Sequence, residues 1–202
     1  IFVCTPNNPT GGTVAVAQIG ALLDGVAGRA LVVVDEAYAE YADTPSLTGM
    51  MERYPNLLIL RTLSKAYGLA GARIGVLIAV EQIIGLIRRI MAPYPLPTPC
   101  VAAALAALAE EATLERERHL MNIRSERGRL SAALAAHPAV RSVWRSDANF
   151  LVFHVNDAKL TWTKLIDSGV IVRDVSHYLG LANCLRVSIG TPRENDAFLA
   201  AL

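Results

Sequence analysis

The sequence has 202 residues, enough for one large domain or two small ones, and its 53% hydrophobic and 18% charged residues predict a buried globular core rather than a disordered chain. A formal net charge of +1, with arginines spread along the chain, makes nucleic acid a poor candidate partner. The apolar stretches at 30–34 and 100–109 are too short to cross a membrane, so we expect no membrane partner.

Three cysteines, Cys4, Cys100 and Cys184, lie far apart in the sequence. They lack the spacing of a structural zinc site or of a disulfide framework. We therefore expect no metal site and a reducing, cytoplasmic location.

The first ninety or so residues alternate short β-branched runs with helical stretches, a pattern typical of parallel strands covered on both faces by crossover helices. The chain opens on an apolar run that reads as a buried strand with no preceding cap, so we expect that it lacks its natural N-terminus. We predict strands at 1–5, 31–35, 57–62 and 73–79, and helices at 15–27 and 81–91. The fold class predicted from this pattern is α/β.

A proline-rich segment at 93–99 interrupts the helical pattern, because each proline removes a backbone donor. The following stretch, 101–134, is rich in Ala, Leu, Glu and Arg and predicts long helices. Further on we predict strands at 140–144, 150–155, 170–174 and 185–189, with helices at 158–167 and from about 192. The chain is thus expected to contain a large domain through 97, linking helices at 98–137 and a small α+β domain at 138–202.

Two polar features follow predicted strands. Asp35 comes directly after the buried run 31–34, where a carboxylate is costly without a cationic partner. A helix N-cap or a salt bridge to a nearby arginine would explain a single aspartate of this kind. The turn at 6–11, rich in Pro, Asn and Gly, could supply an amide to a ligand at the carboxyl edge of the sheet.

The loop at 61–75 gathers a threonine and a serine hydroxyl, a lysine, three glycines and two arginines after an apolar strand. Hydroxyl donors, free backbone amides and a guanidinium are the groups that hold a phosphate, and the lysine amine could attack a carbonyl. The glycines do not match the dinucleotide or P-loop patterns. Thr62 stands where S-x-x-K enzymes need a serine, so that alternative is discarded.

Three motifs, NPTG at 8–11, DEAY at 35–38 and TLSKAYGLAGARIG at 62–75, occur together in the order and spacing of the fold type I pyridoxal-phosphate enzymes, which the chain resembles. The resemblance implies part of a large, mostly parallel-sheet domain followed by a small C-terminal α+β domain. It implies that Lys65 binds pyridoxal 5'-phosphate through its amine and moves a proton during turnover. Asp35 would pair with the pyridine nitrogen and keep it protonated.

The same resemblance assigns the other cofactor contacts. Asn8 and Tyr38 would hydrogen-bond the ring hydroxylate, with Asn7 as the alternative if the turn is offset by one residue. The phosphate would be held by Thr62, Ser64 and Arg73.

Later segments, at 92–99, 147–150, 169–174 and 185–191, are similar to histidinol-phosphate aminotransferases. This similarity implies that Arg186 binds the substrate α-carboxylate and Arg173 the substrate phosphate. A surface salt bridge is the alternative role for Arg186. The implied reaction exchanges an amino group between histidinol phosphate or imidazole-acetol phosphate and 2-oxoglutarate or glutamate, a step of histidine biosynthesis. The resemblance also implies a homodimer. An aromatic-amino-acid aminotransferase or a threonine-phosphate decarboxylase of the same fold is the alternative.

The resemblance also implies an N-terminally truncated chain. In this family a glycine-rich phosphate loop, the aromatic residue stacked on the cofactor and a tyrosine donated across the dimer come from the half that would precede residue 1. A fragment that acts only in association with a partner chain is therefore the alternative to an active enzyme.

Overall fold

The computed structural model describes residues 1–202 and divides them into two compact units. The first unit comprises Ile1–Pro6 and Thr13–Arg118, and the second comprises Asn7–Gly12 and His119–Leu202. None of the helices combines the length and the apolar character that a membrane crossing requires.

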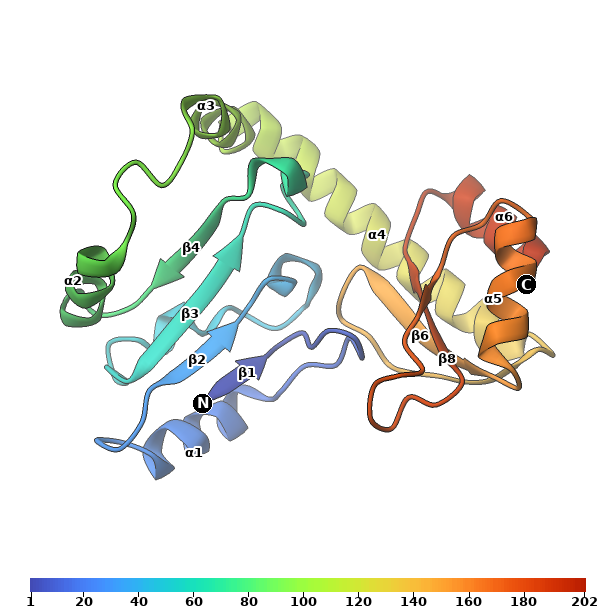
Figure 1. Ribbon diagram of the computed structural model, residues 1–202, viewed down its shortest axis with the longest axis horizontal. Helices are drawn as coiled ribbons and strands as arrows, with labels where there is room; N and C mark the ends of the chain where they lie inside the picture. The colour runs from blue at the N-terminus through green and yellow to red at the C-terminus, as the bar shows by residue number, and fades with distance from the viewer. The chain divides into compact units, whose positions relative to one another are not determined.

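A four-stranded sheet in the order β1-β2-β3-β4 forms the centre of the first unit (Figure 1). The first three strands, β1 (Phe2–Cys4), β2 (Val32–Asp35) and β3 (Leu57–Thr62), are parallel, which confirms the predicted α/β class with a mostly parallel sheet. The last strand, β4 (Gly75–Ile78), runs antiparallel to β3. It departs from the parallel pattern because the loop between them turns the chain straight back beside β3.

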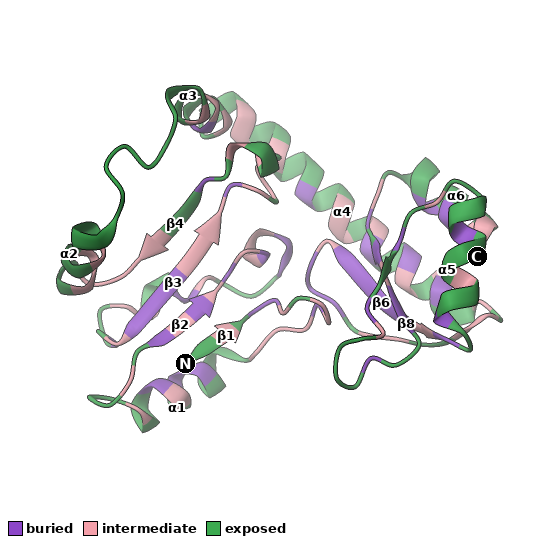
Figure 2. Cartoon of the chain, in the orientation of Figure 1, coloured by how far each residue is buried: buried purple, intermediate pink, exposed green.

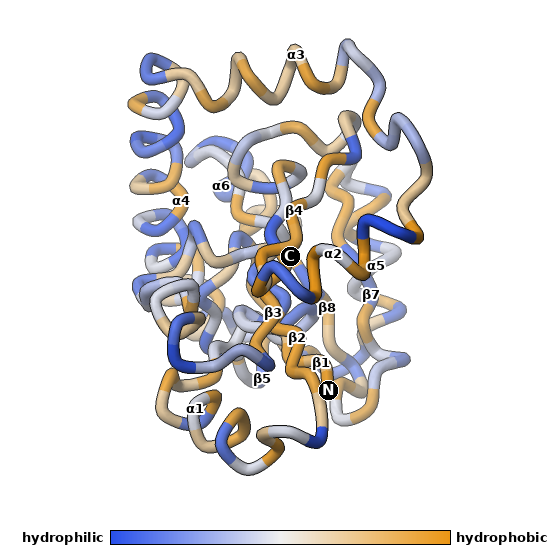
Figure 3. Tube along the Cα trace, turned by 90° about the vertical axis from the view of Figure 1, so that its left-hand side faces the viewer, coloured by the Kyte–Doolittle hydropathy of each residue, from blue (hydrophilic) through white to orange (hydrophobic).

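The core of the first unit lies between this sheet and α1 (Val16–Gly25). Ile19 and Leu23 of the helix are at most 1% exposed, as are Val32, Val34 and Ile59 on the strands. Burying side chains of this size contributes about 1.5–3 kcal/mol each. Figure 3 shows the apolar colour along β2 and β3 that this packing requires.

The connection from β2 to β3 differs from the crossover helices that the sequence pattern predicts. It contains two short 3₁₀ helices, η1 (Ala39–Tyr41) and η2 (Leu47–Met50). Leu47 packs into the same core as α1, so this connection covers its part of the sheet without a full α-helix.

Three helices follow β4: α2 (Glu81–Ile90), α3 (Thr98–Ala107) and α4 (Glu110–Ala136). The proline-rich segment between α2 and α3 is largely exposed (Figure 2). Pro99 lies in the first turn of α3, where its missing N–H costs no helical hydrogen bond. Ala104 of α3 packs against Leu63 and Ile74, which flank the loop between β3 and β4.

The second unit contains an antiparallel sheet in the order β5-β6-β8-β7. Its elements are β5 (Val140–Val143), β6 (Phe150–Val155), α5 (Ala158–Asp167), β7 (Arg173–Asp174), β8 (Cys184–Ser188) and α6 (Pro192–Ala201). The predicted bounds of β6 and α5 are confirmed. β7 is shorter than predicted, because the Val170 N–H donates to the Leu165 carbonyl at the end of α5 instead of to a strand.

The core of the second unit is built from the helices and the two central strands. Leu130 and Leu134 of α4, Phe153 of β6 and Leu165 of α5 are fully buried. Phe153 meets Phe198 of α6 edge to face, with ring centroids 5.7 Å apart. Such aromatic pairs add about 0.5–1.5 kcal/mol beyond the area that they bury.

Candidate active site

The first unit has a cavity of about 530 Å³ at the end of β2 and β3 and the start of β4. Its lining includes five of the residues that the sequence predicts for the cofactor: Asp35, Thr62, Ser64, Lys65 and Arg73. Asp35 ends β2 and Thr62 ends β3, and these two strands are parallel neighbours. Parallel strands bring their carboxyl ends to one edge of the sheet, which is where α/β proteins bind ligands.

The antiparallel direction of β4 brings Lys65 and Arg73 to the same cavity. Thr62 pairs with Gly75, so the chain between them leaves the sheet and returns to it at one edge. Arg73 adopts a left-handed backbone conformation with a φ of 56°, which few residues other than glycine favour. Its guanidinium donates to the Ala70 carbonyl at 3.2 Å. The position thus carries an arginine, although its left-handed backbone conformation would suit glycine better.

Two hydroxyls in the loop are tied to one another. The Thr62 hydroxyl lies 2.9 Å from the Ser64 hydroxyl and accepts a hydrogen bond from the Ser64 backbone N–H at 3.1 Å. The Thr62 hydroxyl also lies 3.2 Å from the Ile74 carbonyl. These contacts hold both oxygens next to Lys65, at positions suited to the oxygens of a phosphate.

The Lys65 side chain is exposed, and its amine lies 5.3 Å from the centre of the Tyr38 ring. This distance is within the range of a cation–π contact. Tyr38 itself is 7% exposed and belongs to the segment that follows Asp35. The structure therefore brings together Tyr38 and Lys65, two residues that the resemblance assigns to the cofactor.

The Asp35 carboxylate accepts a hydrogen bond from the Ala37 backbone N–H at 2.9 Å. This is the local turn that aspartate often makes with its own backbone. Asp35 forms no salt bridge, so the alternative role as partner of a nearby arginine is wrong. The neighbouring arginine, Arg61, instead binds Glu36 and Glu40, at 3.0 Å and 2.7 Å.

Asn8 lies in the second unit, where its side-chain oxygen accepts a hydrogen bond from the Arg186 guanidinium at 2.6 Å. The same guanidinium lies over the Phe150 ring, 4.8 Å from its centre. Asn7, the alternative to Asn8, uses its side chain within the turn, where it donates to the Thr10 hydroxyl at 2.8 Å. Of the two asparagines, Asn8 is the one that contacts a predicted substrate-binding residue.

The turn that carries Asn8 is held tightly against the segment before β6. The Gly11 N–H donates to the Asn7 carbonyl, and the Gly11 carbonyl accepts from the Asp147 N–H at 2.8 Å. Gly11 has a φ of 82°, and a Cβ atom added to it would lie 2.1 Å from the Ser146 hydroxyl oxygen. Only glycine fits this position.

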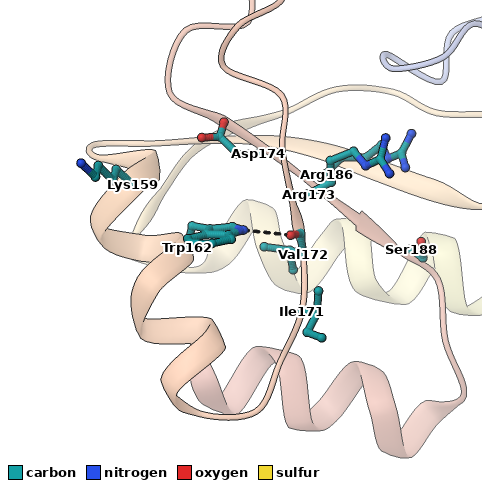
Figure 4. Close-up of a pocket in the computed structure, with 8 residues that line it drawn as sticks. All are labelled: Lys159, Trp162, Ile171, Val172, Arg173, Asp174, Arg186 and Ser188. Carbon is teal, nitrogen blue, oxygen red and sulfur yellow. Dashed lines mark hydrogen bonds between the residues drawn. The ribbon is translucent and has the colours of Figure 1, made fainter.

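Arg173 and Arg186 face one another across β7 and β8, where they are directly paired in register. Both line an open pocket of about 730 Å³ in the second unit, and Figure 4 shows their side chains extending side by side. Like charges directly opposite one another on neighbouring strands are destabilising. Two guanidinium groups on neighbouring strands offer hydrogen-bond donors to an anion in this pocket.

Sequence reasoning gave no functional role to Lys159, Trp162 or Asp174, which also line this pocket. The Trp162 indole N–H donates to the Val172 carbonyl at 3.1 Å, which fixes one wall (Figure 4). The helical spacing of Lys159 and Trp162 on α5 gives no sign of this pocket, because the pocket forms only when α5 packs against β7.

The fold, the cavity beside Lys65 and the pocket between Arg173 and Arg186 are consistent with one enzyme family. The model of the aminotransferase class I and II family matches residues 1–202, and the chain belongs to this family. It is 48% identical over all 202 residues to the histidinol-phosphate aminotransferase of Xanthomonas campestris pv. campestris, of which it covers 56%. It is 46% identical to the enzyme of the same name from Xylella fastidiosa, of which it covers 55%. The chain thus spans little more than half the length of these relatives.

Solved structures agree with this family. The histidinol-phosphate aminotransferase of Clostridium acetobutylicum superposes with a TM-score of 0.91 at 25% identity, covering 100% of this chain and 62% of that one. The enzyme of the same name from Sinorhizobium meliloti, solved in complex with pyridoxal-5'-phosphate, gives a TM-score of 0.84 at 29% identity, covering 100% and 55%. The predicted resemblance to fold type I aminotransferases is confirmed.

Proposed function

We propose that the chain is the cofactor-carrying and substrate-binding part of a pyridoxal-phosphate-dependent histidinol-phosphate aminotransferase. The observation that carries the proposal is the cavity shared by Lys65, Asp35 and the hydroxyl and guanidinium groups of the loop 62–73. The 48% identity to a relative of this name supports the choice of reaction. A cytoplasmic location, a homodimer and the division into domains at 97 and 137 belong to the same proposal.

The groups of this cavity fit pyridoxal 5'-phosphate by their chemistry. Lys65 offers an amine to its aldehyde, Asp35 a carboxylate to its pyridine nitrogen, and Thr62, Ser64 and Arg73 offer donors to its phosphate. When bound, the cofactor supplies the electron sink that makes the α-proton of an amino acid acidic. Tyr38 and Asn8 are the proposed donors to the ring hydroxylate.

Lys65 is the proposed acid and base of the reaction. Its amine, when it is not bound to the cofactor, would move the proton between the substrate α-carbon and the C4′ carbon of the cofactor. The Tyr38 ring beneath the amine limits where it can move. Asp35 would keep the pyridine nitrogen protonated through its negative charge.

The arginine pair supports anionic substrates. In glutamate and 2-oxoglutarate, Arg186 binds the α-carboxylate, and its bond to Asn8 keeps the guanidinium oriented. In histidinol phosphate and imidazole-acetol phosphate, the substrate phosphate binds Arg173. Because the two arginines are paired in register, one phosphate can also bridge both of them.

The cofactor proposal is tested by near-visible absorbance of the purified protein mixed with pyridoxal phosphate, followed by borohydride reduction and peptide mapping. We expect an absorbance band and a reduced adduct that maps to Lys65. Lys65→Ala should lose both, whereas Lys164→Ala, a change on α5, should retain both. Folded protein that gives no adduct at Lys65 would contradict the proposal.

The substrate proposal is tested by comparing imidazole-acetol phosphate with an aromatic keto acid in the full-length enzyme. Arg173→Ala should lower kcat/KM for the phosphorylated substrate by about 10- to 100-fold, as expected for the loss of one charge-assisted bond, and leave the aromatic substrate within about 3-fold. Equal losses for both substrates would favour the aromatic aminotransferase. Release of carbon dioxide from threonine phosphate would favour the decarboxylase.

A further inference from the structure

An arginine of α4 stacks on the loop that carries Lys65, and none of the roles above uses it. The guanidinium of Arg116 lies over the ring of Tyr67, with its Cζ atom 4.5 Å from the ring centre. This distance is within the range of a cation–π contact. Tyr67 is the second residue after Lys65, and all three residues belong to the first unit.

The Arg116 side chain is largely buried without a full set of hydrogen bonds. It is 14% exposed, and its Nη1 atom is buried with no hydrogen-bond partner. Its ion pair with Glu117 spans 3.8 Å, too long for a hydrogen bond, and the Glu117 side chain is exposed. Burial of a charged group with an unpaired donor costs stability, and the face of the Tyr67 ring is the contact that offsets this cost.

Tyr67 shares a tight turn with Lys65. The Gly68 N–H donates to the Lys65 carbonyl at 3.0 Å, so Lys65 is the first and Tyr67 the third residue of a four-residue turn. The Leu69 N–H donates to the Leu63 carbonyl at 3.0 Å and closes the loop around this turn. In so short a loop the backbone cannot shift at Tyr67 without also shifting at Lys65.

The turn presents its two side chains to different surroundings. Lys65 is exposed and lines the proposed cofactor cavity. Tyr67 packs against a cluster of buried side chains formed by Leu63, Ile74 and Ala104. Tyr67 therefore attaches the turn to the core of the first unit, and Arg116 adds a charged contact to this apolar one.

We infer that Arg116 is a positioning residue that holds the Lys65 turn closed by stacking on Tyr67, and so fixes where the Lys65 amine lies in its cavity. The consequence for catalysis rests on the proposed function. The effect on the turn does not, and it is measured without the cofactor. Neither Arg116 nor Tyr67 is required to touch the cofactor.

The first measurement is digestion of the full-length protein by a lysine-specific endoprotease before pyridoxal phosphate is added. Cleavage after Lys65 requires the turn to open, so its rate reports the population of the open form when opening is fast. Arg116→Met keeps a long side chain but removes the charge, and should speed this cleavage by about 10-fold. Cleavage after Lys159 and Lys164, which lie in the second unit, is the internal reference and should stay within about 2-fold.

A double-mutant cycle shows whether Arg116 acts through the aromatic ring. Tyr67→Leu removes the ring, and adding Arg116→Met to it should change the rate of cleavage after Lys65 by less than about 2-fold. Tyr67→Phe keeps the ring, so Arg116→Met should retain most of its effect in that background. Arg118→Met, at an exposed arginine two positions further along α4, is the matched control and should leave the rate unchanged.

The second measurement is steady-state transamination by the loaded enzyme. Arg116→Met should lower kcat by about 5- to 10-fold, because the proposed acid and base is displaced from its place in the cavity. KM should stay within about 2-fold, since the substitution leaves Arg173 and Arg186 untouched. A role in stability alone would lower the amount of folded enzyme without changing kcat for each folded molecule.

Each outcome decides the inference. An unchanged rate of cleavage after Lys65, equal acceleration at Lys159 and Lys164, or additive effects in the cycle would overturn it. If Arg116→Met does not fold, Arg116→Lys keeps the charge without the planar guanidinium and should speed cleavage after Lys65 by about 3-fold. A parent that forms no adduct with pyridoxal phosphate at Lys65 would refute the proposed function instead, while the digestion still decides whether Arg116 holds the turn.

Discussion

Replacing Gly11 by alanine tests how the turn that carries Asn8 is held in the second unit. The added Cβ would lie 2.1 Å from the Ser146 hydroxyl oxygen and 2.6 Å from the Ser146 Cβ, so Ser146 must move. The backbone φ of 82° adds the cost of a left-handed alanine, about 1–2 kcal/mol.

Moving Ser146 breaks local hydrogen bonds. Its buried hydroxyl donates to the Phe150 carbonyl at 2.6 Å and accepts from the Ala148 N–H at 3.1 Å. At about 1 kcal/mol for each bond, these losses bring the total to about 3–4 kcal/mol of unfolding free energy. The substitution should also disturb the bond between Asn8 and Arg186, because Asn8 lies in the same turn.

The assay is urea unfolding followed by tryptophan fluorescence. Both tryptophans, Trp144 and Trp162, belong to the second unit, so the signal reports the unit that contains Gly11. The matched control is Gly169→Ala in the same unit, since Gly169 has a φ of 77° and no atom within 4 Å of an added Cβ. It should cost only the backbone term of about 1–2 kcal/mol.

The difference between the two glycine variants measures the contact with Ser146 alone. If Gly11→Ala costs the same as Gly169→Ala to within about 0.5 kcal/mol, the packing of the turn against Ser146 contributes nothing and the reasoning is refuted. If only Gly11→Ala is strongly destabilised, the close approach of the turn is established.

Three further outcomes are expected. Hydrogen bonds from Arg129 and Asn195 lower the pKa of the Glu126 carboxyl. The stability that Glu126 contributes is therefore present above its unfolded pKa of about 4.3 and is lost as the pH falls through its lower folded pKa. Glu126→Gln should reduce the steepness of acid unfolding measured by circular dichroism. Burial, followed by the charge of Asp35, raises the pKa of the Cys4 thiol. In a protein whose other cysteines are replaced, Asp35→Asn should therefore speed alkylation of Cys4 at pH 8 by about 2-fold. An unchanged rate would show that the two groups do not interact. Phe153→Ala removes a fully buried ring and should cost about 3–5 kcal/mol in the fluorescence assay, and a cost below about 1 kcal/mol would contradict the packing described for the second unit.

Local pattern was sufficient to predict the regular elements. The bounds of β3, β6 and α5 agree with those read from the sequence, because each element is a periodic or apolar run with a clear stop at both ends. The strand β7 is shorter than the sequence predicts, because Val170 and Val172 pack into the core of the second unit without joining the sheet, whereas Ile171 is exposed.

The direction of β4 could not be read from local sequence. An apolar strand looks the same whether it runs parallel or antiparallel to its neighbour. The loop before β4 contains the short 3₁₀ helix η3 (Ala70–Ala72) but no crossover α-helix. The loop residues that line the cavity were nevertheless identified, because a lysine, two hydroxyls and several glycines in one short segment are unusual. Their roles toward a cofactor stay a prediction.

Long-range pairs were beyond the reach of sequence reasoning. The Arg186–Asn8 bond joins residues 178 positions apart, and Arg61 reaches Glu36 across 25 positions. Nothing in the local sequence distinguishes Glu36, which is buried and triply bonded, from an exposed acid beside Asp35. Only the pairing of β2 with β3 brings Arg61 to it.

The placement of Asn7–Gly12 in the second unit has a consequence for how the chain is made. Ribosomes add about 5–20 residues per second, so the 178 positions between Asn8 and Arg186 correspond to roughly 10–35 s of synthesis. The turn that contains Asn8 is therefore synthesised that much earlier than Arg186, its hydrogen-bond partner. The second unit can therefore close only when translation has nearly reached its last helix, while the sheet of the first unit is complete about a hundred positions earlier.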